Sequence, residues 1–301
     1  MRAYGFVETG GPEKQAFLDV PVPDPGPGEL LVRVRAAGVN PGDWRLREGA
    51  YGTVGPAVLG REVAGTVQEL GPGVTGFAVG DEVFGGCPDM VGGWAEQALV
   101  TASFAAHRPA SVAPEVAAAL PVAAGTAYDA LENLRLPSGS TLLVNGAGGG
   151  VGIAVVQLAV ARGLRVVGTA SPAKHALVAG LGAVPVAYGD GVLDRIRAQA
   201  PSGVDAVFDL VGGRSLRTVA GLVEDGSRLL SVADKGLVKE LGGRDVIRDR
   251  STAVLSELAR LVAEGVLDPH VSDVRPLKDA AAALAVVEQG HALGKIVLTL
   301  E

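Results

Sequence analysis

Short and partly alternating apolar runs dominate the first hundred residues of the chain. They predict β-strands at residues 30–36, 62–70, 80–84 and 94–100. Glycine and proline interrupt the chain between these runs, for example at residues 25–28 and 71–73. Short strands separated by such frequent turns are typical of a compact, barrel-like β domain with few helices.

The pattern changes near residue 113, where apolar strands begin to alternate with helical stretches. Helical patterns include residues 116–134, interrupted by Pro121 and Gly125, and residues 151–162. The predicted strands lie at residues 141–145, 165–169, 184–188, 204–210 and 228–232. Short apolar strands separated by helices are typical of a doubly wound parallel sheet.

The last fifty residues contain two amphipathic helical patterns, at residues 253–264 and 277–289, and an apolar strand at residues 295–300. No strand is placed to continue the parallel sheet after the second helix, so we expect the tail to return to the β-rich part. The sequence therefore predicts a β-rich domain from residues 1–113 and 254–301, with an α/β domain of residues 114–253 inserted into it.

Composition and charge narrow the class of protein. Of the 301 residues, 48% are hydrophobic and 20% charged, which easily supplies a buried core. The net charge of −7 and the lack of a long basic run argue against a nucleic-acid or anionic-membrane partner. The sequence has no apolar stretch long enough for a membrane helix and no apolar run typical of a signal peptide near Met1. One cysteine, Cys87, excludes an internal disulfide, and we expect a cytoplasmic enzyme.

A glycine-rich turn, Asn145-Gly-Ala-Gly-Gly-Gly-Val-Gly152, joins a predicted strand to a predicted helix. Glycines at 146, 149 and 152 allow a tight turn, a close approach of pyrophosphate to the backbone, and close packing of helix on sheet. The N-terminus of the following helix favours an anion. A flexible glycine loop is the alternative, but the strand before it and the helix after it favour a dinucleotide site.

The residues after the second strand of this domain favour a phosphorylated cofactor. An NAD site usually has an acidic residue about 20 residues beyond the glycines, to hold the ribose hydroxyls. No Asp or Glu occurs from Asn133 through Gly189, whereas Ser171, Lys174 and His175 could bind a 2′-phosphate. Lys174 could instead be merely solvated on the next helix. We expect NADPH as the cofactor.

Several stretches together resemble one known family. They are Gly38-Val-Asn-Pro-Gly-Asp43, Leu59-Gly-Arg-Glu-Val-Ala-Gly65, Gly125-Thr-Ala-Tyr-Asp-Ala-Leu131, the glycine turn, and Gly294-Lys-Ile-Val-Leu298. Because these stretches occur in this order and at this spacing, the chain resembles the zinc-independent quinone oxidoreductase branch of the medium-chain dehydrogenase/reductases. This resemblance implies an α/β fold in which a GroES-like, β-rich catalytic domain contains an inserted Rossmann dinucleotide-binding domain.

The sequence departs from zinc-using relatives at the metal ligands. Those relatives have Cys where this chain has Asn40, and His where it has Arg61. Asparagine is a poor zinc ligand and arginine is none. The four-cysteine structural zinc loop is also absent, and the four histidines have no ligand spacing. We therefore expect no metal site.

The resemblance also implies roles for individual residues. Asn40 and Tyr51 would lie near the substrate carbonyl, and Thr126 near the nicotinamide. Further cofactor contacts are implied for Gly146, Gly149, Gly150, Val151, Gly152, Ser171, Lys174, Tyr188 and Ser231. Relatives are often dimers joined along the edge of the Rossmann sheet, so a homodimer is expected by resemblance.

Without a metal, the reaction would depend on hydride donation and on hydrogen-bond donors at the substrate oxygen. Hydride would pass to a quinone or to the β-carbon of an α,β-unsaturated carbonyl compound, and Asn40 and Tyr51 are the candidate donors. Tyr51 or water could return the proton. Structural interpretations remain open, because Asn40 precedes Pro41 as in many turns and Tyr51, beside Gly52, could cap a loop.

Other polar residues have similar alternatives. Asp43 is better suited to position its loop than to do chemistry. Asp209 ends a strand where ligands bind in such sheets, or only caps the next turn. Arg61 and Glu62 fit a structural ion pair as well as a site. Two other functions stay open: an NADPH-binding sensor or structural protein with little turnover, and an enoyl reductase of a polyketide or lipid pathway.

Overall fold

The computed structural model describes residues 1–300, and contacts within the chain divide it into two compact units. The first unit consists of Met1–Val122, Arg250–Glu264 and the chain from Pro269 onward. The second consists of Ala123–Asp249 and Gly265–Asp268. The division falls after Val122 and Asp249, whereas the sequence placed it after residues 113 and 253. The difference at the first boundary arises because α2 (Pro114–Ala117) packs on strands of the first unit.

The first unit is built on two sheets. A three-stranded sheet has the order β2-β1-β4, and a larger sheet has the order β14-β15-β3-β5-β6-β8, with β7 also paired to β3. The strands are β1 (Arg2–Phe6), β2 (Gln15–Asp19), β3 (Glu29–Val39), β4 (Ala57–Val58), β5 (Glu62–Leu70), β6 (Glu82–Gly86), β7 (Gln97–Thr101), β8 (Ala105–His107), β14 (Val271–Pro276) and β15 (Lys295–Thr299). The tail of the chain thus adds two strands to this sheet.

Strand β3 is the centre of the larger sheet and positions its polar end. One edge of β3 pairs with β5, and the other is shared between β7, near Glu29, and β15, near Val39. The inward-facing β3 residues Leu30, Val32, Val34 and Ala37 are buried in a core that includes Trp94 and Phe6. Because β15 pairs antiparallel with the last residues of β3, its first residue, Lys295, lies beside the end of β3.

Within residues 1–300, the α-helices of the first unit are α1 (Pro41–Arg47), α2, α9 (Thr252–Ala263) and α10 (Ala280–Glu288). Helix α1 begins where β3 ends, with Asn40 at its N-cap position and Pro41 in its first turn. The buried Arg47 guanidinium at its end donates to both carboxylate oxygens of Glu288, at 3.1 and 2.8 Å. This ion pair attaches α1 to α10.

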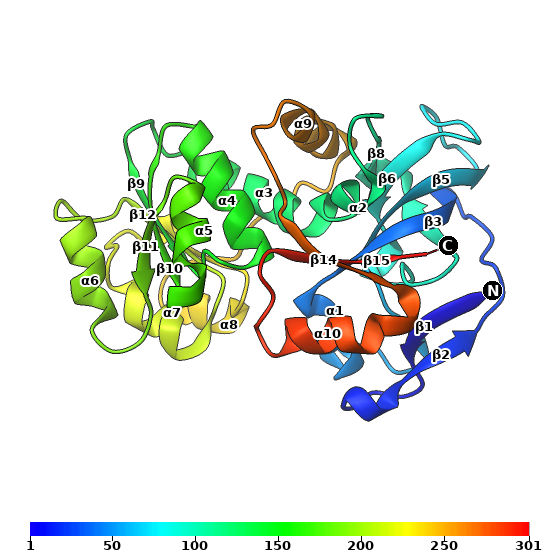
Figure 1. Ribbon diagram of the computed structural model, residues 1–301, viewed down its shortest axis with the longest axis horizontal. Coiled ribbons are helices and arrows are strands. Elements are labelled where there is room, and N and C mark those ends of the chain that lie inside the picture. Colours follow the sequence, from blue (N-terminus) through cyan, green and yellow to red (C-terminus); the bar gives the residue numbers. More distant parts are fainter. Residues whose placement is uncertain (301) are drawn as a thin grey trace. The chain divides into compact units, whose positions relative to one another are not determined.

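The second unit contains a five-stranded parallel sheet with the order β11-β10-β9-β12-β13, flanked by helices (Figure 1). Its strands are β9 (Thr141–Asn145), β10 (Arg165–Ala170), β11 (Val184–Ala187), β12 (Ala206–Asp209) and β13 (Leu229–Ser231). Its helices are α3 (Gly125–Leu134), α4 (Gly150–Ala161), α5 (His175–Gly180), α6 (Val192–Gln199), α7 (Gly213–Ala220) and α8 (Lys235–Glu240). The strand order reverses at β9, where sheets of this kind bind ligands.

The predicted helix at residues 116–134 consists of three pieces. Helix α2 ends at Ala117, a π-helical turn covers Leu120–Ala124, and α3 starts at Gly125. Pro121 lies in the π-helical turn, as expected of a residue that cannot donate a backbone hydrogen bond. The two interruptions expected from the sequence therefore mark real changes of helix type.

Candidate functional site

The glycine turn connects β9 to α4 and brings the chain back against its own backbone. Gly146 has a φ of +99°, a conformation that favours glycine. Its N–H donates to Thr169 Oγ1 (3.0 Å), and the Ala147 N–H donates to the Thr169 carbonyl (2.9 Å). A Cβ on Gly152 would lie 2.4 Å from the Gly146 oxygen. The turn is therefore held to β10 and leaves no room for a side chain at Gly152.

The start of α4 is suited to an anion. Gly149 is the N-cap residue, and Gly150, Val151 and Gly152 form the first turn of the helix. The first N–H groups of a helix have no acceptor within it, and the helix dipole places partial positive charge there. A Cβ on Gly149 would meet no atom closer than 3.9 Å, so space is open beside this N-terminus. The turn thus forms a cradle that fits a pyrophosphate.

Ser171, Lys174 and Tyr188 follow the ends of two adjacent strands. Ala170 of β10 pairs with Ala187 of β11, so Ser171 and Tyr188 come directly after neighbouring residues of the sheet. Lys174 Nζ donates to the Gly148 carbonyl of the glycine turn (3.3 Å), and burial lowers the pKa of this amine below its ordinary value. The Tyr188 side chain is exposed. The structure thus places the three residues on the same edge of the sheet as the glycine turn.

A buried polar network supports this edge. Asn145 Nδ2 donates to Asp209 Oδ1 (2.6 Å), and Asn145 Oδ1 accepts from Thr169 Oγ1 (2.7 Å). Asp209 Oδ2 accepts from Ser231 Oγ (2.7 Å) and from the Gly212 N–H (3.0 Å). Asp209 therefore caps the turn after β12, which was one of its two expected roles. The fully buried Ser231 supports Asp209, since its hydroxyl hydrogen is directed at that carboxylate.

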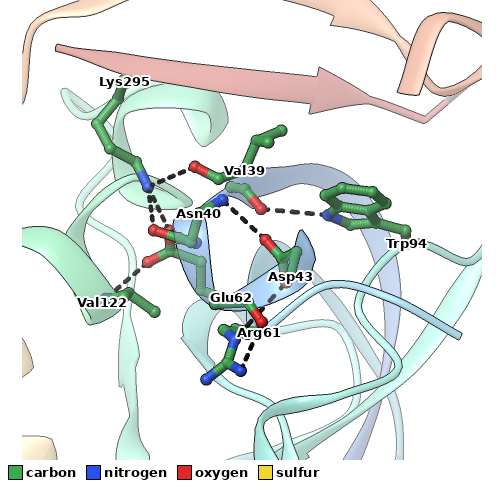
Figure 2. A network of polar contacts seen from close by, with 10 residues as sticks. Val39, Asn40, Asp43, Arg61, Glu62, Trp94, Val122 and Lys295 are labelled. Atoms are coloured by element: carbon green, nitrogen blue, oxygen red, sulfur yellow. Dashed lines mark hydrogen bonds and ion pairs between the residues drawn. The ribbon is translucent and has the colours of Figure 1, made fainter. Parts of the chain in front are cut away.

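A second polar cluster lies in the first unit, around the end of β3 (Figure 2). Asn40 Nδ2 donates to Glu62 Oε1 (2.8 Å), and Asn40 Oδ1 accepts from Lys295 Nζ (2.7 Å). Lys295 Nζ also donates to Glu62 Oε1 (2.7 Å) and to the Val39 carbonyl (3.3 Å). The Val122 N–H donates to Glu62 Oε2 (2.7 Å). Asn40, Glu62 and Lys295 are all at least 97% buried.

Asp43 and Arg61 lie on the other side of Asn40. Asp43 Oδ2 accepts from the Asn40 N–H (2.7 Å), which satisfies a donor at the start of α1, as expected of a residue that positions its loop. Arg61 Nη2 donates to the Gly42 carbonyl (2.8 Å). Burial raises the pKa of Asp43 to about 6, although the Arg61 charge and the Asn40 N–H act in the opposite direction.

Within residues 1–300, Tyr51 is connected to this cluster through Arg61 alone. The Arg61 guanidinium lies over the Tyr51 ring, 5.0 Å from its centroid. The Tyr51 side chain is 65% exposed, and its hydroxyl makes no hydrogen bond with residues 1–300. Its φ of 73° lies in the left-handed region, which is unusual for a non-glycine residue. Thr126, in the second unit, is buried in the first turn of α3.

Two features of these clusters differ from the sequence interpretation. Arg61 and Glu62 do not pair with each other: Arg61, just before β5, lies 3.7 Å from Asp43, whereas Glu62, the first residue of β5, pairs with Lys295. Lys295 was noted only as part of the Gly294–Leu298 motif, and its contact with Asn40 was missed. A lysine at the first position of an apolar strand was the available signal, since lysine is rarely buried without a partner.

The described residues offer neither a cluster of metal ligands nor a membrane-spanning helix. Within residues 1–300 no group of three or more His, Cys, Asp or Glu side chains could hold a metal ion. In that same range, no helix has the length and apolar character needed to cross a membrane. The carboxylates of Glu62 and Asp43 are paired with the cations Lys295 and Arg61, and burial raises the pKa of the nearby Cys87 thiol. These donors do not fit a zinc ion.

Two protein families match the chain. The family described as "Alcohol dehydrogenase GroES-like domain" matches residues 26–110, and the family described as "Zinc-binding dehydrogenase" matches residues 181–298. These matches agree with the predicted fold class, a GroES-like β-rich part with a Rossmann-type parallel sheet, which is therefore confirmed. The second match is to a family named for zinc, although the residues described above do not fit that metal.

Curated relatives and solved structures are similar over the whole chain. A quinone oxidoreductase of Rattus norvegicus is 32% identical, with all of this chain and 98% of the relative covered. A 2-methylene-furan-3-one reductase of Solanum lycopersicum is 31% identical, with 99% of this chain and 79% of the relative covered. The structure of an Escherichia coli quinone oxidoreductase complexed with NADPH has a TM-score of 0.89, 26% identity, and full coverage of both chains.

Proposed function

Because the chain belongs to the quinone oxidoreductase branch of the medium-chain dehydrogenase/reductase family, we propose that it is an NADPH-dependent reductase of quinones or α,β-unsaturated carbonyl compounds. Membership of this family supports an oxidoreductase activity. The choice of cofactor and of electron acceptor is our proposal. A cytoplasmic location stays a prediction from the sequence, and a homodimer stays a prediction from the resemblance.

The observation that carries the proposal is the glycine turn between β9 and α4. Its backbone closes against the Thr169 hydroxyl and carbonyl, and the site of a Gly152 Cβ is filled by the Gly146 oxygen. The open N-terminus of α4 beside Gly149 fits the pyrophosphate of a dinucleotide. Gly146, Gly149, Gly150, Val151 and Gly152 would hold that group.

The residues beyond β10 and β11 support the phosphorylated cofactor. Lys174 is a half-buried amine attached to the glycine turn, with Ser171 and Tyr188 at the same sheet edge. No carboxylate lies between Asn133 and Gly189 to repel a 2′-phosphate. A lysine ammonium is a compact charge that suits a phosphate group. We therefore propose that these three residues select NADPH over NADH.

The cluster around Asn40 supports the reductase step. NADPH, when bound, would supply the hydride. Negative charge then develops on the acceptor's oxygen, and a preorganised hydrogen-bond donor lowers the barrier most when it is fixed in advance. The Asn40 amide is such a donor because Glu62 and Lys295 hold it on both sides. Tyr51, with its exposed hydroxyl near Arg61, is the proposed source of the proton.

The experiment that tests this proposal is the consumption of NADPH by the purified protein with a panel of quinones, enones and enals. We expect turnover with at least one of these classes, and faster turnover with NADPH than with NADH. Tight NADPH binding without turnover across the panel would support the sensor function instead. Failure to bind either nicotinamide cofactor would contradict both the reductase and the sensor function.

A further inference from the structure

Lys295 is a cation placed almost entirely out of water. Its side chain is 97% buried, and all three hydrogens of its ammonium group have acceptors: Glu62 Oε1, Asn40 Oδ1 and the Val39 carbonyl. An ion pair buried in this way is often no more stabilising than apolar residues of similar volume. Stability alone therefore does not account for a lysine at this position.

The contacts of Lys295 determine the orientation of the Asn40 amide. Oδ1 of Asn40 faces the ammonium group of Lys295, and Nδ2 faces the carboxylate of Glu62 (Figure 2). The reverse orientation would place two donors together at Lys295 and two acceptors together at Glu62. The oxygen and nitrogen ends of the amide are therefore distinguished by their partners, and only one orientation of the side chain satisfies both.

One donor of this fixed amide is left over. Nδ2 carries two hydrogens, and Glu62 Oε1 accepts one of them. No other residue within 1–300 accepts from Asn40 Nδ2. An N–H held in a buried site, with no acceptor of its own, is the kind of group that binds an oxygen of a ligand.

The charge of Lys295 makes this remaining hydrogen a better donor. A cation at the amide oxygen draws electron density toward that oxygen and away from the nitrogen, and the effect is strong where water is excluded. Glu62 balances the charge and holds the other hydrogen, so that the cluster stays neutral. Because the three hydrogens of Lys295 already have acceptors, the lysine acts through Asn40 and not directly on a ligand.

We propose that Lys295 is a positioning residue that fixes and polarises the Asn40 amide, so that its free Nδ2 hydrogen binds the acceptor's carbonyl oxygen as charge develops there. This role rests on the proposed reductase function. It assigns a function in the reaction to a residue 255 positions away from Asn40 in the sequence.

A substitution at Lys295 tests the role through the rate. Lys295→Met keeps the stem and removes the charge, and we expect kcat and kcat/KM to fall together by about ten- to a hundredfold. The affinity for NADPH should not change, because the glycine turn is untouched. Lys295→Arg, which keeps the charge, should recover part of the loss. Lys278→Met, at an exposed lysine, is the matched control and should be as active as the parent.

Because Lys295→Met leaves Glu62 buried without its cation, a second variant separates folding from catalysis. The double variant Lys295→Met/Glu62→Gln has no charge at either position and is expected to unfold near the temperature of the parent. If the role of Lys295 were purely structural, the double variant would recover the rate together with the stability. Our proposal requires that the stability returns and the rate does not.

A double-mutant cycle with Asn40 completes the test. In an Asn40→Ala background, Lys295→Met should change kcat less than about twofold, because its effect passes through the missing amide. An equal loss in both backgrounds, or full activity of Lys295→Met, would overturn the role while leaving the reductase function intact. No turnover of the parent with any acceptor would overturn the proposed function, and this role with it.

Discussion

Arg61 Nε lies 3.7 Å from Asp43 Oδ1, and neither atom makes a hydrogen bond with any of residues 1–300. Asp43 is fully buried, and burial raises the pKa of its carboxyl group from 3.8 to about 6. The ionised carboxylate at neutral pH is thus only partly compensated by Arg61 and by the Asn40 N–H.

This relationship predicts how stability depends on pH. Between about pH 4 and pH 6 the folded protein keeps a proton on Asp43 that the unfolded chain releases. The contribution of Asp43 to the free energy of unfolding is therefore largest below pH 4 and is lost as the pH rises through 6. A shift of this size corresponds to about 3 kcal/mol. Asp43→Asn should lack this dependence.

Urea unfolding from pH 4 to pH 8, followed by tryptophan fluorescence, measures the effect. Both tryptophans, Trp44 and Trp94, belong to the same unit as Asp43. The buried Asp129 of the other unit also has a pKa raised by burial to about 6, so the parent must be compared with Asp43→Asn at each pH. We expect the free energy of unfolding of the parent to fall relative to that of Asp43→Asn as the pH rises. A difference in this free energy that stays constant, or that grows in favour of the parent, would contradict this account.

Lys174 should control the choice between the two nicotinamide cofactors. Removing its charge with Lys174→Ala should weaken NADPH binding by about tenfold, as for the loss of one hydrogen bond to a charged group, and leave NADH binding nearly unchanged. Titration of both cofactors measures the ratio. Lys239→Ala, at an exposed lysine of α8, is the control. Equal affinities for NADPH and NADH in the parent would refute the assignment.

Gly152 should tolerate no side chain. In Gly152→Ala the new Cβ would lie 2.4 Å from the Gly146 oxygen, so the glycine turn must shift. We expect a loss of about 1–3 kcal/mol in stability and a weaker affinity for NADPH, measured by thermal unfolding and titration. Gly180→Ala, at a helical glycine with open space around it, should be neutral or stabilising. Unchanged NADPH binding by Gly152→Ala would argue against the turn as the cofactor site.

The sequence predicted the parallel sheet well because all its strands except β11 are largely buried apolar runs with clear boundaries. The pattern around Asn145 and Gly152 needed only local information: a strand, a turn that requires glycine, and a helix. Helix α1 was missed although Asn40 and Pro41 carry a recognisable helix start, because seven residues are too few to show a helical period. Strand β14 has no fully buried residue, and its pattern contains little apolar signal.

The cluster around Asn40 could be predicted only in part. Asn40 and Glu62 came from motifs that lie 22 residues apart, whereas Lys295 comes from the other end of the chain. Their contact depends on the pairing of β15 with β3, which no local pattern specifies. The contact of Arg61 with Asp43 instead of Glu62 likewise depends on how α1 and the residue before β5 come together in the fold, which no local pattern specifies.

The most direct test of the proposed function is the fate of the hydride in a single turnover. NADPH carrying deuterium on one face of C4, and then on the other, would be oxidised with the acceptor that is reduced fastest in the panel. We predict that one labelled cofactor loses all its deuterium and the other keeps all of it, with the label at the β-carbon when the acceptor is an enone. A mixture of the two outcomes, or no oxidation of bound NADPH, would contradict a reductase that transfers hydride from a fixed cofactor.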